Sequence, residues 1–328
     1  MLARDGYSPF VFHLHDIEQS FVEEDIKRYL TNVLGSMPQP PSSNEIERLA
    51  KRAGKLFIYA ATAARYINPD DIPAANSRAR LLTVLGMPPA PSRTSASTKQ
   101  YKGLDALYTS ILSAAFNDEL EAEETTCMEL VLRTVICTKE PMTAETMASL
   151  LGLTKGEVEI ALEPLWSVLH VPEAGGLVAA LHASFPDYLL DSRRSGIFYC
   201  NRVLQGELLA SCCFGVMERQ LRFNICKLES SFVFDKDVVN LNERIKSSIS
   251  PSLSYSCQYW GEHLGAAANT KELRQKLLDF LSNRLLFWME VLNLKKQMGM
   301  GPGILRQVKR WLGTTDVSEQ IYETRHGN

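Results

Sequence analysis

Three polar residues near the middle of the chain have the side-chain types of a hydrolytic triad. His182, Ser184 and Asp187 lie close together in the stretch LHASFPDYL at 181–189. The members of a triad usually come from separate loops, and the chain contains no GxSxG run. The spacing suits the start of a helix better, because Ser184 can cap it and Pro186 can occupy its first turn. We therefore disfavour a hydrolase.

The imidazole of His182 would then lie at the N-terminus of that helix. Unpaired backbone N–H groups and the positive end of the helix dipole favour an anion at such a position. A histidine donor pointing the same way would complete a contact with a phosphate. The alternative is a histidine bonded to a nearby carbonyl at a strand end, and the residues alone leave both interpretations open.

Metal and disulfide chemistry find little support in the sequence. His13 and His15 alternate as ligands on one strand face would, but no third ligand accompanies them, so we favour a structural role for the pair. The 7 cysteines are scattered, and none belongs to a CxxC pair. We therefore expect neither a zinc site nor a disulfide framework, and we expect a reducing, cytoplasmic environment.

The elements around His182 predict a winged helix. A helix over 125–138 is followed by a short helix that Thr143 caps and Gly152 ends. Thr154 and Glu157 form a capping box, which opens the second helix of a helix-turn-helix. We expect that helix to bury Val158, Ala161, Leu162, Leu165 and Trp166. Strands over 168–171 and 177–181, joined by a glycine turn at 173–176, would form the wing.

The remaining chain is predicted to be helical. Capping boxes at Ser20 and Ser42 open two helices, and an Ala-rich stretch over 56–67 predicts a buried helix at the centre of a bundle. Further helices are expected over 104–116, 204–221, 240–249, 253–265, 271–298 with a break near 282–283, and 304–312. The fold class is therefore mainly α: a helical bundle, a winged helix with a small β-hairpin wing, and a C-terminal helical domain.

Composition and charge narrow the classes of partner. The chain has 328 residues, 45% of them apolar, and a net charge of −3. It has no apolar run long enough to span a membrane, so no membrane partner is expected. Winged helices often read DNA, but residues 118–191 hold 14 acidic and 3 basic side chains, a net charge of −11. Because a phosphate backbone would be repelled, we expect no nucleic-acid partner.

Several short stretches together resemble fungal NACHT-type STAND NTPases. They are LHDI at 14–17, DIKRYL at 25–30, LFIYAATA at 56–63, LDALYTSIL at 104–112 and LHASFPDYL at 181–189, and the resemblance continues through 253–264 and 283–294. Such proteins carry a P-loop nucleotide-binding domain, a helical lid domain, a winged helix and a second helical domain.

The resemblance implies a domain order for this chain. Residues 1–16 would be a remnant of the nucleotide-binding domain, and 17–117 a lid-like helical domain with a mobile loop at 88–99, which is rich in Pro, Ser and Thr. Residues 118–200 would be the winged helix, 201–312 the second helical domain and 313–328 a frayed tail.

The resemblance also assigns two candidate nucleotide contacts in a complete homologue. His182 matches the winged-helix histidine that contacts the ADP phosphate in the closed state. Phe57 falls where the lid loop touches adenine, but Lys55 stands where relatives often have glycine, so Phe57 can equally be a core residue.

The sequence contains no match to the phosphate-binding loop of the family. No GxxxxGK[ST] run occurs, and no paired acids follow an upstream strand to hold magnesium. We therefore expect no catalysis and no cofactor in this chain, although ADP or ATP is implied for a complete homologue. The expected role is a regulatory arm whose partner is the nucleotide-binding domain of a STAND protein or another protein. A stand-alone helical interaction scaffold is the alternative, and a winged-helix nucleic-acid binder is less favoured.

Overall fold

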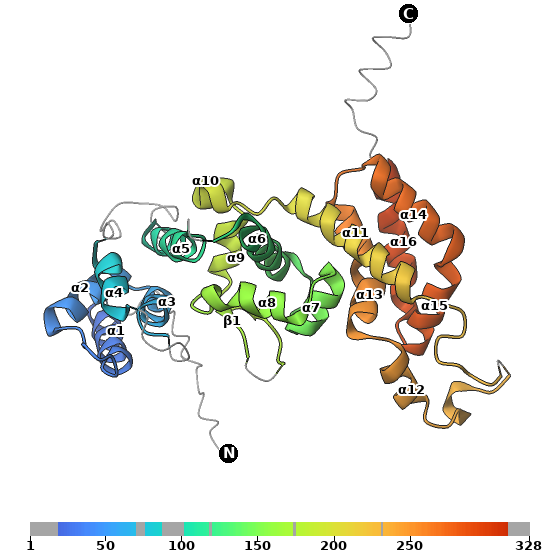
Figure 1. Ribbon diagram of the computed structural model, residues 1–328, viewed down its shortest axis with the longest axis horizontal. Helices are drawn as coiled ribbons and strands as arrows, with labels where there is room; N and C mark the ends of the chain where they lie inside the picture. The colour runs from blue at the N-terminus through green and yellow to red at the C-terminus, as the bar shows by residue number, and fades with distance from the viewer. Residues whose placement is uncertain are drawn as a thin grey trace, which may run out of the picture. The chain divides into compact units, whose positions relative to one another are not determined.

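The computed structural model describes residues 19–69, 76–86, 102–117, 120–172, 175–230 and 232–313 (Figure 1). These residues are mainly helical and contain one two-stranded antiparallel sheet, so the predicted fold class is confirmed. The chain divides into two compact units. The first comprises residues 1–115 with 166–168, and the second comprises 116–165 with 169–328.

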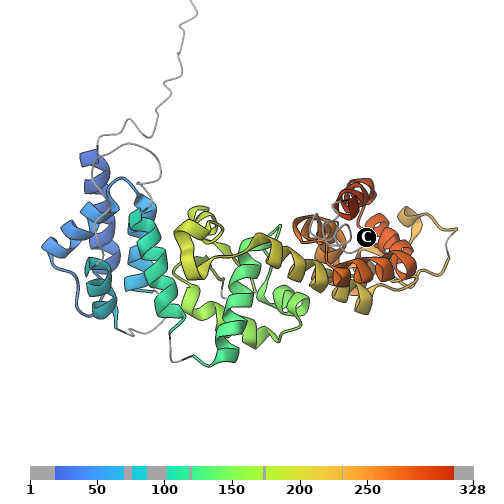
Figure 2. The ribbon, with the colours of Figure 1, turned by 90° about the horizontal axis from the view of Figure 1, so that it is seen from above.

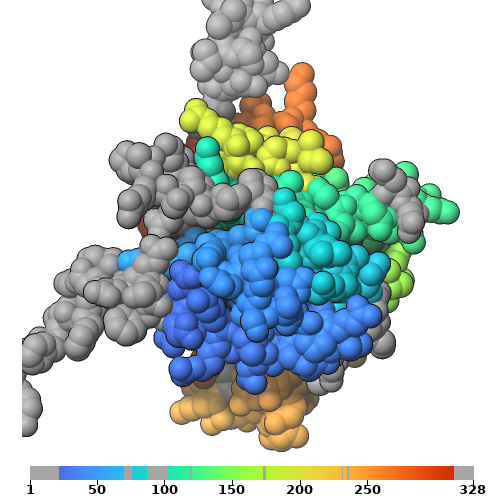
Figure 3. All heavy atoms as spheres, turned by 90° about the vertical axis from the view of Figure 1, so that its left-hand side faces the viewer, coloured from blue at the N-terminus to red at the C-terminus, as the bar shows by residue number. Residues whose placement is uncertain are grey.

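The first unit is a helical bundle, coloured blue to teal in Figures 2 and 3. Its helices are α1 (Gln19–Leu34), α2 (Ser43–Ala53), α3 (Phe57–Ile67), α4 (Ser77–Gly86) and α5 (Lys102–Ala115). The central helix is α3, which contacts each of the other four. Its small side chains allow this close approach, since Ala60, Ala63 and Ala64 are buried. The predicted central position of this Ala-rich helix is confirmed.

Local signals set the ends of α2. The Ser42 hydroxyl accepts from the backbone N–H of Glu45, and the Glu45 carboxylate accepts from the N–H of Ser42, which is the predicted capping box. Gly54 ends the helix with φ +56°, a left-handed conformation that favours glycine. The capping box expected at Ser20 is wrong, because α1 is already helical at Gln19 and Ser20 lies inside it.

Some predictions for this half of the chain lie outside the described residues. They concern the domain remnant at 1–16 with its histidine pair, His13 and His15, and the loop at 88–99. All but the first residue of the predicted tail at 313–328 lies outside as well.

The second unit begins with the elements that were predicted to form a winged helix. They are α6 (Ala122–Cys137), α7 (Ala144–Leu151), α8 (Lys155–Leu162), β1 (Leu169–His170), β2 (Ala179–Ala180) and α9 (Ser184–Leu189). The strands pair with Leu169 opposite Ala180, and Gly175 between them takes φ +68°. The predicted helix-turn-helix and hairpin are both present.

The predicted caps of the helix-turn-helix are confirmed. Thr143 accepts from the N–H of Thr146, Gly152 adopts the left-handed conformation, and Thr154 forms a reciprocal capping box with Glu157. The first helix begins three residues earlier than expected, because Glu121 lies at its N-cap and its backbone N–H donates to the Glu124 carboxylate.

One core prediction fails at the end of α8. The helix stops at Leu162, and a 3-10 turn over Glu163–Leu165 follows. Pro164 explains the stop, since proline lacks the N–H that a continuing helix needs. Trp166 therefore lies beyond the helix and is only half-buried. The other four residues that this helix was expected to bury are buried as predicted: Val158, Ala161, Leu162 and Leu165.

The rest of the second unit is a helical layer. Its helices are α10 (Ser192–Ser195), α11 (Arg202–Gln220), α12 (Leu241–Ser248), α13 (Pro251–Ala266), α14 (Lys271–Asn283), α15 (Leu285–Leu294) and α16 (Gly301–Gly313). Helices α11 and α13 pack along their lengths, and α6 and α7 contact α11. The predicted break falls at Arg284, although the second segment ends at Leu294 and not at 298.

An aromatic cluster forms the core of this layer. The Trp260 ring lies 4.9 Å from that of Phe280 and 5.9 Å from that of Trp288, measured between centroids. Phe214 joins the cluster from α11. The indole N–H of Trp288 donates to the carbonyl of Cys257, so burial leaves this polar group satisfied. The cluster connects α11, α13, α14 and α15.

The further domain boundary predicted within this unit, at 200–201, stays a prediction.

Candidate functional site

His182 immediately precedes α9, at the end of the wing. Its Nδ1 accepts from the backbone N–H of Ser184 at 3.1 Å and lies 2.8 Å from the Ser184 hydroxyl. A ring nitrogen that accepts from a backbone N–H carries no hydrogen, so the hydrogen of the neutral ring is on Nε2. The side chain is exposed. The local structure therefore fixes the ring and presents an N–H donor at its outer edge.

This arrangement corrects one prediction about Ser184. The residue does not cap α9: the helix begins at Ser184, the N-cap residue is Ala183, and no side chain there caps it. The Ser184 side chain is instead buried against His182. Pro186 does lie in the first turn, as predicted. Because α9 has only 6 residues and carries Asp187 in its first turn, its dipole adds little attraction for an anion.

The positions of Ser184 and Asp187 can be compared with what a hydrolase would need. A serine nucleophile has to reach its substrate, but Ser184 is buried, with 8% of its surface exposed. Asp187 is exposed in the first turn of α9. The 2.8 Å distance from His182 Nδ1 to the Ser184 hydroxyl is within the range of a nucleophile and its base, but the same Nδ1 also accepts from the backbone N–H of Ser184.

Phe57, the second candidate, belongs to the first unit. It is the first residue of α3, and 44% of its side chain is exposed. Its ring lies 4.9 Å from that of Tyr29 on α1. Phe57 is therefore not part of the buried core, and the core interpretation is wrong. Gly54 takes a positive φ immediately before the exposed Lys55. The glycine of this turn therefore lies one position before Lys55.

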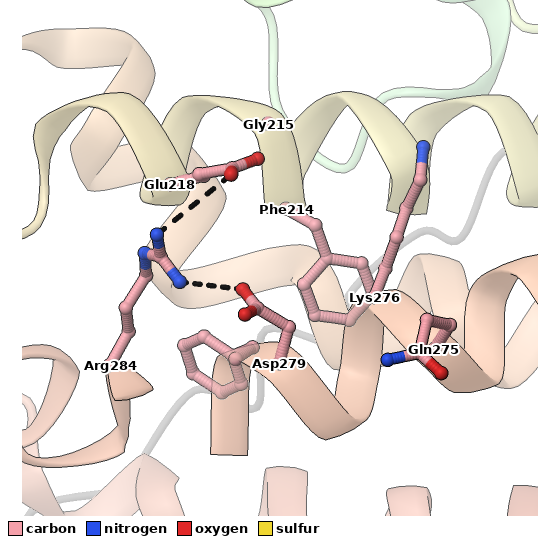
Figure 4. A pocket seen from close by; sticks show the side chains of 8 residues that line it. Phe214, Gly215, Glu218, Gln275, Lys276, Asp279 and Arg284 are labelled. Carbon is pink, nitrogen blue, oxygen red and sulfur yellow. Dashed lines mark hydrogen bonds and ion pairs between the residues drawn. The ribbon is translucent and has the colours of Figure 1, made fainter. Parts of the chain in front are cut away.

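A cavity of about 310 Å³ lies between α11 and α14 (Figure 4). Arg284 points between Asp279 and Glu218 and forms ion pairs with both. Lys276 forms an ion pair with Glu272 at 3.1 Å and donates to the Ser211 hydroxyl. Because these charges are matched within the protein, the cavity has no clear preference for a charged ligand.

A larger cavity, of about 490 Å³, is bordered by the N-termini of α7 and α13. Hydroxyl groups dominate its polar lining, but they bond to one another. Thr143 and Thr146 are 2.9 Å apart between hydroxyl oxygens, and Ser149 and Ser252 are 2.8 Å apart. The second contact joins α7 to α13, and we interpret both contacts as structural.

A third cavity, of about 260 Å³, is lined by Cys137, Lys139, Arg202 and His263 among others. The sulfur of Cys137 lies 3.5 Å from that of Cys200. Sequence reasoning missed this pair, because the two residues are 63 positions apart and no local motif marks them. Only a contact between distant segments reveals it.

Exposed apolar residues gather in the segment that joins α11 to α12. Phe223, Phe232, Phe234 and Val239 each expose more than 70% of their surface. The apolar run FVF at 232–234 is visible in the sequence, but its exposure is not, because a continuous apolar run is normally expected to be buried.

Within the described ranges, no group of three or more His, Cys, Asp or Glu side chains is placed to hold a metal ion. None of the described helices combines the length and apolar character needed to cross a membrane. No protein family, curated protein or solved structure was found to match the chain.

Proposed function

We propose that the chain is a non-catalytic regulatory and interaction arm, resembling the arm that closes over ADP in NACHT-type STAND proteins. The observation that carries this proposal is the position of His182. It follows a helix-turn-helix and hairpin directly, is exposed, and has its Nδ1 tied to the backbone N–H of Ser184. An oriented Nε2–H donor at that place suits a phosphate oxygen held by another domain.

The charge of the winged-helix region supports a protein partner over a nucleic acid. On α8, the helix that would face DNA, Lys155 is paired with Glu159 at 3.1 Å. Its cation is therefore neutralised within the helix, and a phosphate backbone would meet mainly carboxylates. In the proposed role, the arm holds a nucleotide-binding domain closed with ADP and swings away on exchange, a rigid-body switch biased by a phosphate contact.

Binding to a partner domain tests the proposal. The chain is titrated into a recombinant nucleotide-binding domain of a fungal NACHT protein, loaded with ADP or with a non-hydrolysable ATP analogue. We expect tighter binding to the ADP form. We also expect His182→Ala to weaken that binding about 5- to 150-fold, the loss of one hydrogen bond of roughly 1 to 3 kcal/mol.

A matched control is available on the hairpin. His170 is also an exposed histidine, on β1, so His170→Ala removes the same side chain without touching the Ser184 contact. This variant is expected to bind like the unmodified chain. Equal affinities of the His182 and His170 variants would contradict the proposed phosphate contact.

The alternative function, a stand-alone interaction scaffold, is favoured by one specific observation. Phe232 is 94% exposed and Phe234 is 73% exposed, and exposed aromatic side chains are typical of binding surfaces. If the scaffold hypothesis is correct, a Phe232→Ser, Phe234→Ser variant loses a partner that the His182→Ala variant retains. Leu286→Ser, at a position 74% exposed on α15, controls for the loss of exposed apolar surface alone.

A further inference from the structure

Cys137 and Cys200 bring together two segments of the second unit. Cys137 is the last residue of α6, and Cys200 lies between the 3-10 turn Gly196–Phe198 and α11. The N–H of Cys200 donates to the carbonyl of Leu189 at 2.8 Å, which fixes its backbone. The two sulfurs are 3.5 Å apart. A disulfide requires about 2.05 Å, so the sulfurs need to approach by roughly 1.5 Å.

The surroundings of the pair favour a thiolate. The hydrogen bond from Cys137 lowers the pKa of the Cys200 thiol, and the cations of Arg133 and Arg202 act in the same direction. The same contact raises the pKa of Cys137, as does its burial. These two shifts place the proton of the contact on Cys137, which makes Cys200 the more acidic thiol of the pair.

Access to the pair is through the cavity of about 260 Å³. Cys137 lines this cavity and is half-buried, whereas Cys200 is fully buried. Lys139 and Arg202 line it too, so a small polar oxidant would enter beside two cationic residues. By contrast, burial raises the pKa of both Cys213 and Cys257, which keeps those thiols protonated.

We propose that Cys137 and Cys200 form a reversible redox site, in which a hydroperoxide that enters the cavity converts the two thiols into a disulfide. This site is independent of the proposed nucleotide-facing role.

The chemistry balances with hydrogen peroxide as the oxidant. Cys137 first passes its proton to the Cys200 thiolate, because only the Cys137 sulfur borders the cavity. The Cys137 thiolate then attacks one peroxide oxygen, so that the O–O bond breaks and hydroxide leaves. The resulting sulfenic acid of Cys137 is then attacked by the Cys200 sulfur. The S–O bond breaks, the S–S bond forms, and the Cys200 proton leaves with the hydroxyl group as water. Two sulfurs are oxidised, and the peroxide is reduced to water and hydroxide.

The bond would close a loop that contains the helix-turn-helix and the hairpin. Cys137 and Cys200 are 63 positions apart, and α7, α8, β1, β2 and α9 lie between them. The disulfide would also tie the end of α6 to the segment that leads into α11. Closing a loop of this length stabilises the folded state mainly by restricting the unfolded chain.

Peroxide treatment followed by mass spectrometry tests the proposal. The full chain is reduced, freed of reductant, exposed to hydrogen peroxide and then alkylated. We expect the intact protein to lose two hydrogens and a digest to yield a linked peptide containing Cys137 and Cys200. Dithiothreitol should reverse both changes. The melting temperature of the oxidised protein should rise by roughly 5 to 10 °C.

Two variants separate the pair from general oxidation. Cys137→Ser should abolish the linked peptide and the rise in melting temperature, whereas Cys127→Ser, at the other half-buried thiol of α6, should retain both. The proposal fails if the unmodified chain forms no linked peptide, or if the main link joins other cysteines. It also fails if Cys137 accumulates only as a sulfinic acid. These readouts on the unmodified chain do not depend on how well a variant folds.

Discussion

The hydroxyl of Tyr255 lies 2.7 Å from Nε2 of His263, within hydrogen-bond distance, and both side chains are buried on α13. The same hydroxyl oxygen accepts from the backbone N–H of Lys139 at 3.2 Å. Burial lowers the pKa of His263 to about 4, and the charge of Lys139 acts in the same direction.

Stability should consequently fall in mild acid. In the unfolded chain a histidine binds a proton near pH 6.5, but in the folded protein His263 does so only near pH 4. Between these values the unfolded state binds more protons, so the free energy of unfolding decreases as pH falls. We expect a loss of about 2 kcal/mol between pH 7.5 and pH 5 from this residue. Urea unfolding over that range measures it.

The control for this prediction is His263→Gln, which cannot titrate. Its stability at pH 7.5 can be lower than that of the unmodified chain, but its dependence on pH should be flatter. Equal slopes in the two proteins would show that His263 is not the responsible group.

A second prediction concerns the ion pair that joins α2 to α4. Arg78 donates to both carboxylate oxygens of Glu45, at 2.7 and 3.1 Å. This bond, followed by that from the Ser42 N–H, lowers the pKa of Glu45 to about 2. The side chain of Arg78 is 39% exposed. Solvent therefore screens the pair, and Arg78→Ala should cost only about 1 kcal/mol at pH 7.

The sign of the acid dependence follows from the lowered pKa of Glu45. The stabilisation is present above the ordinary carboxyl pKa near 4.5 and is lost as pH falls toward 2. The difference between the unmodified chain and Arg78→Ala should therefore shrink over that interval in chemical unfolding. Lys51→Ala, which breaks an exposed pair with Glu47 on the same helix, should have a smaller effect. A loss from Lys51→Ala as large as that from Arg78→Ala would contradict the assignment.

A third prediction concerns the contact of α13 with α16. A Cβ atom added at Gly261 would lie 2.6 Å from Cγ2 of Ile304, closer than packed atoms approach. Gly261→Ala should therefore destabilise the fold by roughly 1 to 3 kcal/mol, despite the better helix propensity of alanine.

The control for Gly261→Ala lies on α11. At Gly215 the nearest atom is a terminal nitrogen of Arg219 at 3.3 Å, which can move away. Gly215→Ala should be neutral or slightly stabilising. Adding Ile304→Ala to Gly261→Ala should recover part of the loss, and strict additivity of the two changes would argue against a steric cause.

A fourth prediction concerns nucleotide binding by the isolated chain. The Nε2–H of His182 offers one hydrogen bond, worth roughly 1 to 3 kcal/mol, whereas micromolar affinity requires about 8 kcal/mol. We expect no ATP turnover and no ADP binding tighter than millimolar. Calorimetry with ADP and magnesium measures this, and a micromolar dissociation constant would reveal a binding site that the described residues do not suggest.

Local interactions explain why much of the fold could be predicted from the sequence. The caps at Ser42, Thr143 and Thr154 join atoms of residues only three positions apart, so the necessary partners are visible in the sequence. Gly152 ends α7 because only its own backbone has to adopt the left-handed conformation. The helix-turn-helix, the hairpin and the mainly helical class followed from such signals. The place of His182 after the hairpin followed with them.

Tertiary packing decided the remaining features, because they depend on which distant segments meet. The sulfur contact between Cys137 and Cys200, the burial that lowers the pKa of His263, and the exposure of Phe232 have no local signature. Each depends on the free energy of placing a side chain against neighbours far away in the sequence. The sequence by itself determined where most helices begin and end, whereas only the folded chain determined which side chains are buried, exposed or brought into contact.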